Sequence, residues 1–567
     1  MGWAAEPKQI ASAGATRIEA EAILREAGAS DAMVALWEQD TRGESPEDIR
    51  EFVEDLRNDS PDKRREIVEN MRRNYQYVQG PDSQSQSGVP HGTTFEFSFD
   101  HSNIFPGTTR TITVYVPAQY TAEKPACVYV GLDSLAFEAP TVFDNLIAKG
   151  QMPVTIGIGI EPGNVPAGQT AQTPRFNRSV EFDAPSDQLA RFLLEEVIPE
   201  VERHSTPAGL PIRLSQDPND RAVGGASTGG IGSFTLAWEH PDAFRRVFSA
   251  IGTYVGMRGG DRYPVLVRKT EPKPIRIFMQ DGSHDELTDW LGEVGDWWLG
   301  NQTMLSALQF AGYSVEHVWG EGSHDTKHAT AVFPDAMRFL WADWPQPVTA
   351  RVSQNNMLSA TLLPGEAWVG VTKPEKSVET FLSASEQHKA LAPGTAGDEY
   401  LTEPTTGKLW LQRSTGKKTV VDTGLQHPTG VAVSPDGLWL AVAESRTHWG
   451  YSYQIQPDGA LQNKQRFYWF HVPDYADDSG AEGLAVDRDG RLYAATRLGV
   501  QVFDHNGRSR AILPLPGGEA RAIAFDPRHL DVLYVRCADG HIYRRKFKVP
   551  GVLPGGAALQ VPNWGPG

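Results

Sequence analysis

The sequence predicts an α/β region with a mainly parallel sheet, preceded by a small helical region and followed by an all-β, propeller-like region. Short apolar runs alternate with longer helical stretches between residues 86 and 345, the order of a parallel sheet with helices on both faces. After the Pro-rich joint WADWPQPVTA, helical periodicity nearly disappears. A length of 567 residues also favours several domains.

Residues 1–85 are expected to form helices with polar, charged faces. Two helix starts stand out, because Ser45 and Ser60 are suitable N-caps and each precedes a proline at the first helical position. Asp48 lies in the first turn of the earlier helix. The charged faces indicate a solvated surface, and no chemistry is assigned to this region.

Residues 86–345 form the predicted α/β region. Strands are expected at the alternating runs TTFEFSF and RTITVYV and at the apolar runs CVYV, VTIGIGI, RAVGGA and IRIFMQ. The stretch PSDQLARFLLEEVIPEVERH, residues 185–204, is typical of a helix. This alternation predicts a sheet enclosed between helices.

Residues 346–567 are expected to form a reduced β-propeller. Three segments resemble one another: HPTGVAVSPDGLWLAVA, GAEGLAVDRDGRLYAAT and ARAIAFDPRHLDVLYVR. Aligning Val433, Val486 and Phe525 gives spacings of 53 and 39 residues, which is the range of a propeller blade. At about 40 to 50 residues per blade, the region holds four or five blades.

Charge and composition exclude several classes of function. The 53 basic and 71 acidic residues leave a net charge of −18, which disfavours nucleic acid and anionic membranes as partners. No apolar run approaches the roughly 18 residues that cross a bilayer, so no membrane span is expected. Cys127 and Cys537 lie far apart, which argues against a disulfide framework. The start MGWAAEPKQ shows no export signal, and the compartment stays open.

The stretch RAVGGASTGGIGSFTLAWEHP contains a G-x-S-x-G motif with Ser227 at its centre. An apolar strand precedes the motif and a helix follows it, the context that lifts a serine hydroxyl above a sheet. A nucleophilic serine needs a histidine base and a carboxylate, in the chain order Ser, Asp, His. IRIFMQDGSHDEL supplies Asp281 and Asp285, and VEHVWGEGSHDTKH supplies His324 and His328.

Residues 90–344 resemble the enterochelin esterase and esterase-D-like family, which includes feruloyl and acetyl xylan esterases of carbohydrate esterase family 1. The resemblance is carried by GTTRTITVYVPAQY, NRSVEFD, GGASTGG, FMQDGSHDEL and GEGSHDTKHATAVFPDAMRFLW. It implies an α/β hydrolase with Ser227 as nucleophile, Asp285 as the acid ending a G-x-x-D loop, and His324 as base. The run before the base reads G-G-H in the family and Gly322-Ser323-His324 here.

The same resemblance implies the surroundings of the site. The backbone N–H groups of Thr228 and Leu135 are expected to hold the oxyanion, in a loop that reads Asp133-Ser134 where the family has Asp-Gly. Arg178 and Glu181 in NRSVEFD match a family loop beside the site and predict a loop-ordering ion pair.

Trp290, Trp297 and Trp298 follow Asp285 closely. They are candidates for an aromatic wall that stacks a sugar or a phenolic acyl group. Core packing explains them equally well, so the pattern leaves both interpretations open.

The C-terminal region resembles the senescence marker protein 30, or gluconolactonase, family of calcium-dependent propellers. Members hold a divalent metal with a Glu, two Asn and an Asp, one Asn lying in a P-N-G run. The matching positions read Pro428-Thr429-Gly430 and Ala481-Glu482-Gly483 here, a poorer ligand set for a hard cation. We therefore expect no metal and a non-catalytic propeller.

Together these features predict a serine esterase without a cofactor that hydrolyses a carbohydrate-linked ester, acetyl or feruloyl, through an acyl-enzyme. The substrate is a small molecule or linked to a polysaccharide, and a secreted or periplasmic location is expected. Two alternatives remain: hydrolysis of a siderophore or other catechol ester, and a metal-dependent sugar lactonase in the propeller. The oligomeric state stays open.

Overall fold

The computed structural model describes residues 7–167, 173–285, 292–391, 397–552 and 559–562. They form two compact units. The first comprises Met1–Asp261, Ile275–Thr303 and Val315–Val348, and the second comprises Arg262–Pro274, Met304–Ser314 and Thr349–Gly567. The N-terminal helices therefore belong to the same unit as the large sheet. The three-domain division at residues 85 and 345 stays a prediction.

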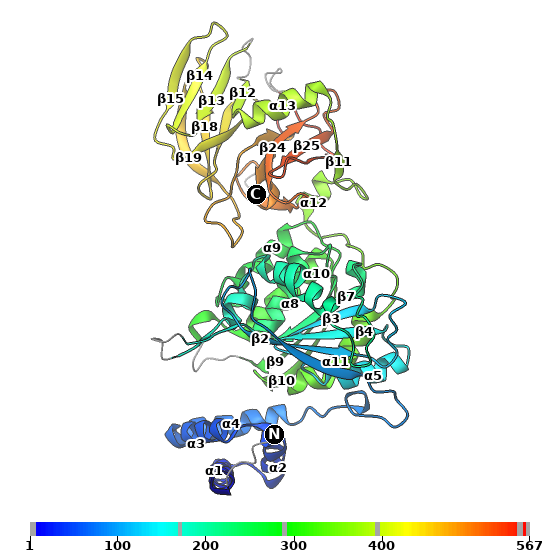
Figure 1. Ribbon diagram of the computed structural model, residues 1–567. Helices are drawn as coiled ribbons and strands as arrows, with labels where there is room; N and C mark the ends of the chain where they lie inside the picture. The colour runs from blue at the N-terminus through cyan, green and yellow to red at the C-terminus, as the bar shows by residue number, and fades with distance from the viewer. Residues whose placement is uncertain (1–6, 168–172, 286–291, 392–396, 553–558, 563–567) are drawn as a thin grey trace. The chain divides into compact units, whose positions relative to one another are not determined.

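The described chain opens with the helices α1 (Pro7–Glu26), α2 (Asp31–Asp40), α3 (Pro46–Asn58) and α4 (Pro61–Asn74) (Figure 1). The expected starts at Ser45 and Ser60 are confirmed, because each hydroxyl accepts the backbone N–H three residues later. Ser45 and Asp48 form a reciprocal capping box. The sequence pattern had singled out only α3 and α4 within this helical region.

The first unit is built on an 8-stranded sheet in the order β1-β2-β4-β3-β7-β8-β9-β10. The strands are β1 (Thr93–Phe99), β2 (Arg110–Val116), β3 (Cys127–Leu132), β4 (Thr155–Ile160), β7 (Arg221–Ala226), β8 (Arg246–Ala250), β9 (Arg276–His284) and β10 (Ser314–Ser323). The neighbours from β4 to β9 pair in parallel, whereas β1 and β2 are antiparallel. The predicted mainly parallel sheet is confirmed. The short strands β5 (Asn164–Val165) and β6 (Arg175–Phe176) form a separate ribbon.

Helices cover both faces of this sheet, as expected for an α/β hydrolase (Figure 1). On one face α5 (Ala139–Ala148) and α11 (Lys327–Trp341) pack their apolar side chains against β3 and β8. On the other, α8 (Thr228–Glu239) lies against β7 and β8. Because both faces are covered, the central strands β3, β7 and β8 are buried along almost their whole length.

The stretch predicted as one helix at 185–204 is divided in the structure. It comprises α6 (Gln188–Arg191), a π-helical segment (Phe192–Val197) and α7 (Ile198–Arg203). Pro199 lies in the first turn of α7 and has no N–H to donate to the preceding helical turn, where the π-helical segment lies. Two further helices are α9 (Tyr263–Lys269) and α10 (Trp297–Ala311).

The second unit contains four 4-stranded sheets among the described residues, which meets the prediction of four or five blades (Figure 1). Three blades are β12 (Lys389–Leu391) to β15 (Lys418–Asp422), β16 (Pro428–Val433) to β19 (Leu461–Trp469), and β20 (Leu484–Val486) to β23 (Ser509–Leu513). The two middle strands of these blades are, in order, β13 (Glu399–Glu403) and β14 (Lys408–Gln412), β17 (Trp439–Glu444) and β18 (Trp449–Ile455), and β21 (Leu492–Thr496) and β22 (Gly499–Phe503).

The fourth blade joins the two ends of this unit. It comprises β24 (Ala520–Phe525), β25 (Val532–Cys537), β26 (Ile542–Lys546) and, from the start of the unit, β11 (Val369–Val371). The helices α12 (Asn356–Thr361) and α13 (Lys376–Glu386) precede the blades, and α13 packs on β24. The three similar sequence segments each supply the first two strands of a blade, which explains their resemblance.

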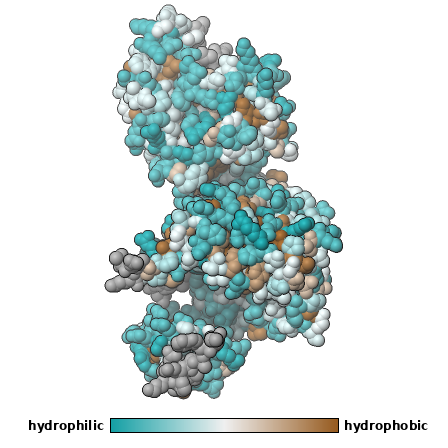
Figure 2. All heavy atoms as spheres, in the orientation of Figure 1, coloured by the Kyte–Doolittle hydropathy of each residue, from teal (hydrophilic) through white to brown (hydrophobic). Residues whose placement is uncertain are grey.

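The surface agrees with the acidic composition. Figure 2 shows a face that is mostly hydrophilic, with apolar residues scattered over it. None of the described helices combines the length and the apolar character that a membrane crossing requires.

Replacing Ser45 by Ala removes the hydroxyl that caps α3. We expect the free energy of unfolding of the N-terminal helices to fall by about 1 kcal/mol. Ser45→Asp keeps a capping oxygen and is expected to stay within a few tenths of a kcal/mol of the wild type. Urea titration followed by circular dichroism measures both, and equal losses in the two variants would contradict the capping role.

Candidate active site

Three residues singled out from the sequence lie at the ends of strands of the large sheet. Ser227 directly follows β7, Asp285 follows β9 and His324 follows β10. In an open α/β sheet, functional groups gather where parallel strands end. The topology therefore brings together residues that are far apart in the chain.

Ser227 occupies a sharp turn between β7 and α8. Its φ of 57° and ψ of −119° are strained for a residue with a side chain. The turn needs glycine at Gly225, since a Cβ there would lie 2.7 Å from the carbonyl carbon of Gly229. The Ser227 N–H donates to the Ala250 carbonyl at 2.9 Å, which fixes the turn on the neighbouring strand. The serine side chain is thereby presented at the first turn of α8.

His324 connects the other two residues. Its Nε2 lies 2.8 Å from the Ser227 hydroxyl oxygen, and its Nδ1 lies 2.6 Å from Asp285 Oδ1. The Asp285 side chain is 0% exposed, whereas that of His324 is 19% exposed. The structure thus arranges a serine, a histidine and a carboxylate in one hydrogen-bonded chain whose serine end is the more open one.

His328, the rival base, makes different contacts. Its Nδ1 accepts a hydrogen bond from the Gln280 amide at 2.9 Å, and its ring stacks on Tyr77 with centroids 3.9 Å apart. Burial lowers the pKa of His328 to about 4. This histidine is a neutral packing residue at the start of α11.

Asp281, the rival acid, lies behind Asp285. It is completely buried, and its Oδ1 accepts the Gly282 N–H at 2.7 Å. Within the described residues, the Oδ2 atoms of Asp281 and Asp285 are both buried without another hydrogen-bond partner, and the two carboxyl groups interact with each other. Burial, together with the Asp285 carboxyl, raises the pKa of Asp281 well above its usual range. Asp281 therefore stays protonated and donates a hydrogen bond to Asp285.

Burial sets the charges of the site. It lowers the pKa of His324 to about 4, and it raises the pKa of Asp285 to about 7 against the opposing hydrogen bond from Asp281. Above pH 7 the imidazole is therefore neutral and Asp285 is ionised. In that state the Ser227 hydroxyl donates to His324 Nε2, and His324 Nδ1–H donates to Asp285.

Thr253 is a neighbour of Ser227 that the sequence patterns did not indicate. Its hydroxyl lies 3.5 Å from Ser227 Oγ, and its N–H donates to the Ser227 carbonyl at 3.2 Å. The Trp297 indole N–H donates to the Thr253 hydroxyl at 3.3 Å. Thr253 could have been placed near the site from the run RVFSA, which precedes it and forms β8. The sequence patterns did not predict a strand there.

The loop after β3 carries the proposed second oxyanion donor. Asp133 and Ser134 have φ values of 63° and 78°, the left-handed region in which glycine is favoured. Ser134 adopts this conformation although it carries a side chain, at the position where the resembled family has glycine. Thr228 opens α8, where the first N–H groups have no partner within the helix. The oxyanion roles of Thr228 and Leu135 stay predictions.

Arg178 and Glu181 do not pair with each other, which corrects the expected single ion pair. Arg178 Nε and Nη2 bind the two oxygens of Asp133 at 2.8 and 2.6 Å, and Nη2 reaches the Ala226 carbonyl at 3.4 Å. Glu181 instead pairs with Arg110, and both of these side chains are 0% exposed. Two separate ion pairs therefore order segment 178–181, and the pair of Arg178 lies next to Ser227 through the Ala226 carbonyl.

The tryptophan cluster is largely packing. Trp297 is 1% exposed and meets the His324 ring edge-on at 5.8 Å and 72°. Of the two interpretations that the sequence left open for Trp297, its burial favours core packing over a substrate wall. Trp298 is partly exposed and packs against Trp319 at 5.3 Å. Trp290 lies outside the described residues.

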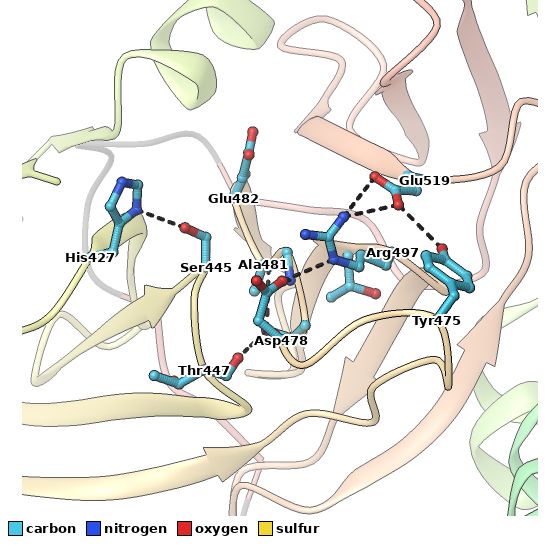
Figure 3. Close-up of polar contacts among 12 residues, drawn as sticks. His427, Ser445, Thr447, Tyr475, Asp478, Ala481, Glu482, Arg497 and Glu519 are labelled. Carbon is cyan, nitrogen blue, oxygen red and sulfur yellow. Dashed lines mark hydrogen bonds and ion pairs between the residues drawn. The ribbon is translucent and has the colours of Figure 1, made fainter. Parts of the chain in front are cut away.

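A second polar cluster lies in the second unit (Figure 3). Arg497 points between two carboxylates and binds Asp478 at 2.9 Å and Glu519 at 3.0 Å. Arg521 binds Glu519 at 3.2 Å and also binds Glu482. Two guanidinium groups therefore bind all three carboxylates and leave one net negative charge in the cluster.

These residues do not fit the calcium site of the resembled propellers. The Thr429 hydroxyl donates a hydrogen bond to the backbone carbonyl of Ala481 at 2.6 Å, so it is already engaged within the protein. Glu482 is engaged by Arg521. Over the described residues, no three His, Cys, Asp or Glu side chains are grouped so that they could hold a metal ion. A hard cation prefers unpaired oxygen ligands, which this cluster does not offer.

Two family models match separate parts of the chain. Residues 102–336 match the Esterase model, described as "Putative esterase", and residues 388–539 match the "SMP-30/Gluconolactonase/LRE-like region". Both resemblances stated from the sequence are confirmed. A pentonolactonase of Haloferax volcanii is 28% identical over 138 residues, which is 24% of this chain and 46% of that protein.

Solved structures also resemble the chain. The enterobactin esterase of Shigella flexneri is 18% identical, with 45% of this chain and 62% of that chain covered and a TM-score of 0.33. A ferulic acid esterase of Anaeromyces mucronatus is 19% identical, with 46% and 95% covered and a TM-score of 0.35. The chain thus spans less than half of the pentonolactonase and less than two thirds of the enterobactin esterase.

Replacing Glu181 by Ala leaves Arg110 buried and unpaired. We expect the free energy of unfolding to fall by about 3–5 kcal/mol. Replacing both residues by Leu removes the buried charge as well and is expected to cost less than the single change. Thermal and urea unfolding of the two variants measure this difference. A double variant that is less stable than Glu181→Ala would contradict the account.

Proposed function

We propose that the chain is a serine carboxylic-ester hydrolase that acts on a carbohydrate-linked ester of the acetyl or feruloyl type through an acyl-enzyme. The hydrogen-bonded chain from Ser227 through His324 to Asp285 carries this proposal. The match of residues 102–336 to the Esterase model supports the same reaction class. Ser227, His324 and Asp285 are assigned as nucleophile, base and acid.

The distances suit proton transfer between these groups. The Ser227 oxygen attacks the ester carbonyl carbon as its proton passes to His324 Nε2, which lies 2.8 Å away. The imidazolium is stabilised by Asp285, which accepts from Nδ1. The Nε2 proton then goes to the departing alcohol oxygen, leaving the acyl group on Ser227. A water molecule then attacks the acyl carbonyl carbon as its proton passes to His324 Nε2. The bond to the Ser227 oxygen breaks, and this oxygen takes the proton back from His324, which releases the acid and restores the serine.

The developing negative charge needs hydrogen-bond donors. We assign the backbone N–H groups of Thr228 and Leu135, which would stabilise the oxyanion by hydrogen bonding. Thr228 opens α8, so the positive end of the helix dipole adds to this stabilisation. The Arg178–Asp133 ion pair orders the loop that carries Leu135.

The charges near Ser227 favour a neutral sugar ester over an anionic catechol ester. Arg178, the guanidinium that reaches the Ala226 carbonyl, is neutralised by both oxygens of Asp133. The whole chain carries a net charge of −18, which repels anionic substrates. The region that resembles sugar lactonase propellers fits a role in carbohydrate breakdown.

A second candidate activity is a sugar lactonase in the propeller. The match of residues 388–539 and the similarity to a pentonolactonase favour it. The ion pairs of Arg497 and Arg521 count against it, because they occupy carboxylates that a divalent cation would need.

Activity on a panel of acetylated, feruloylated and glucuronate-linked sugar esters, a catechol ester and sugar lactones tests the proposal. Ser227→Ala is expected to lower kcat on the preferred sugar ester by about 10³-fold or more. A chelator is expected to leave the wild-type rate unchanged. Activity that survives in Ser227→Ala but disappears with chelator would move the chemistry to the propeller, and preference for the catechol ester would replace the substrate class.

The pH dependence follows from the burial of the carboxyl groups. Protonating Asp285 removes the partner of the imidazolium, so kcat/KM is expected to rise with pH with a midpoint near the Asp285 pKa of about 7. Asp281→Leu removes the hydrogen bond that lowers this pKa and should move the midpoint to higher pH. Asp281→Asn keeps a donor and should stay closer to the wild type. A midpoint that Asp281→Leu leaves unchanged would exclude the carboxyl pair from the titration.

A further inference from the structure

The end of helix α4 contacts the strand end that precedes His324. Asn74, the last residue of α4, is 8% exposed. Its Nδ2 donates to the Ser323 hydroxyl at 2.8 Å, and its Oδ1 accepts the Ser323 N–H at 3.0 Å. A two-point contact of this kind fixes both the backbone and the side chain of the residue adjoining His324.

Tyr77 contacts the same segment on both sides of His324. Its hydroxyl oxygen accepts the Glu321 N–H at 2.7 Å. Its ring stacks on His328 at 3.9 Å with an angle of 14° between the planes. Glycine at position 320 permits this approach, since a Cβ there would collide with the Tyr77 hydroxyl. The residues before and after His324 are therefore held by one tyrosine.

A third contact anchors the start of α11. The Lys327 ammonium pairs with Asp40 at 2.9 Å and lies 4.9 Å from the centre of the Tyr75 ring. Asp40 ends α2, so two of the N-terminal helices contribute to the same contact region. The segment with His324 is thus attached to the N-terminal helices by hydrogen bonds, ring stacking and an ion pair.

The sequence of the His324 segment matches this arrangement. Ser323 stands where the resembled family has glycine in its G-G-H run. Its added hydroxyl is the group that Asn74 Nδ2 binds. The serine that replaces the family's glycine therefore provides a hydrogen-bond acceptor for the N-terminal region.

We propose that Asn74 and Tyr77 are positioning residues that hold His324 Nε2 within reach of Ser227. The proposal rests on the function proposed above. The contact with Asp285 restrains the imidazole at Nδ1, and the N-terminal contacts restrain the backbone from which the ring extends. Both restraints act together, because a ring that pivots about its Asp285 contact would move Nε2 away from the serine. The N-terminal helices thus form part of the hydrolase.

Asn74→Leu removes both hydrogen bonds to Ser323 at similar side-chain volume. We expect kcat to fall about tenfold and KM to stay within about twofold, since a small displacement of a catalytic group slows the chemical step. Labelling of Ser227 by a fluorophosphonate should slow by the same factor. Tyr77→Phe keeps the stacked ring and removes the acceptor for Glu321, and a smaller decrease of the same kind is expected.

Asn70→Leu is the matched control, because Asn70 lies one turn earlier on α4 and its side chain accepts from Arg73. It should leave kcat and the labelling rate unchanged. The downfield proton resonance of His324 Nδ1–H reports the ring position directly. It should broaden or shift in Asn74→Leu and persist unchanged in Asn70→Leu, whereas a purely structural role for Asn74 would lower the melting temperature and leave the resonance intact.

Ser227→Ala, assayed in parallel, separates the two proposals. If Ser227→Ala is inactive while Asn74→Leu and Tyr77→Phe match Asn70→Leu in kcat and resonance, the esterase function stands and the positioning role is overturned. If Ser227→Ala retains the activity, the proposed function fails, and the His324 resonance alone decides whether Asn74 orients the imidazole.

Discussion

The hydrogen bond between His324 Nε2 and Ser227 depends on three chain segments ending at one edge of a sheet. The parallel pairing from β4 to β9 provides that edge, and helices on both faces make the pairing stable by excluding water from apolar strands. The strained backbone of Ser227 is tolerated because its N–H and carbonyl are bound by Ala250 and Thr253. The site is thus a consequence of the strand order of the sheet.

Burial then decides the charges within this geometry. A low-dielectric environment disfavours both an imidazolium and a carboxylate, so it keeps His324 neutral and raises the pKa of Asp285 at the same time. Asp281 moderates the second effect by donating its retained proton to Asp285. Two carboxyl groups that would repel each other when ionised act as one acid and one acceptor. Asp281, which the sequence offered as an alternative acid, therefore forms a hydrogen bond with Asp285 and not with the histidine.

Ion pairs serve different purposes in the two units. In the first unit, the pairs of Arg178 with Asp133 and of Arg110 with Glu181 join segment 178–181 to the loop after β3 and to the start of β2. In the propeller, Arg497 and Arg521 bind carboxylates that could otherwise bind a cation. In the first unit the ion pairs restrain loops, whereas in the second unit arginines and carboxylates form a connected network of ion pairs. The chemistry is proposed for the first unit because Ser227, His324 and Asp285 form a hydrogen-bonded chain there.

The sequence by itself determined the parallel sheet, the blade repeats, the caps at Ser45 and Ser60, and the turn at Ser227, because periodicity, capping and glycine placement act over a few residues. It indicated the segments that supply the acid and the base, and the family resemblance favoured Asp285 and His324 over Asp281 and His328. Only the tertiary structure showed which of these carboxyl and imidazole groups meet, that Arg178 and Glu181 have separate partners, and that Trp297 is buried. It alone placed Asn74 against Ser323, a contact between residues 249 positions apart. Such long-range contacts depend on how whole elements pack, which local patterns do not encode.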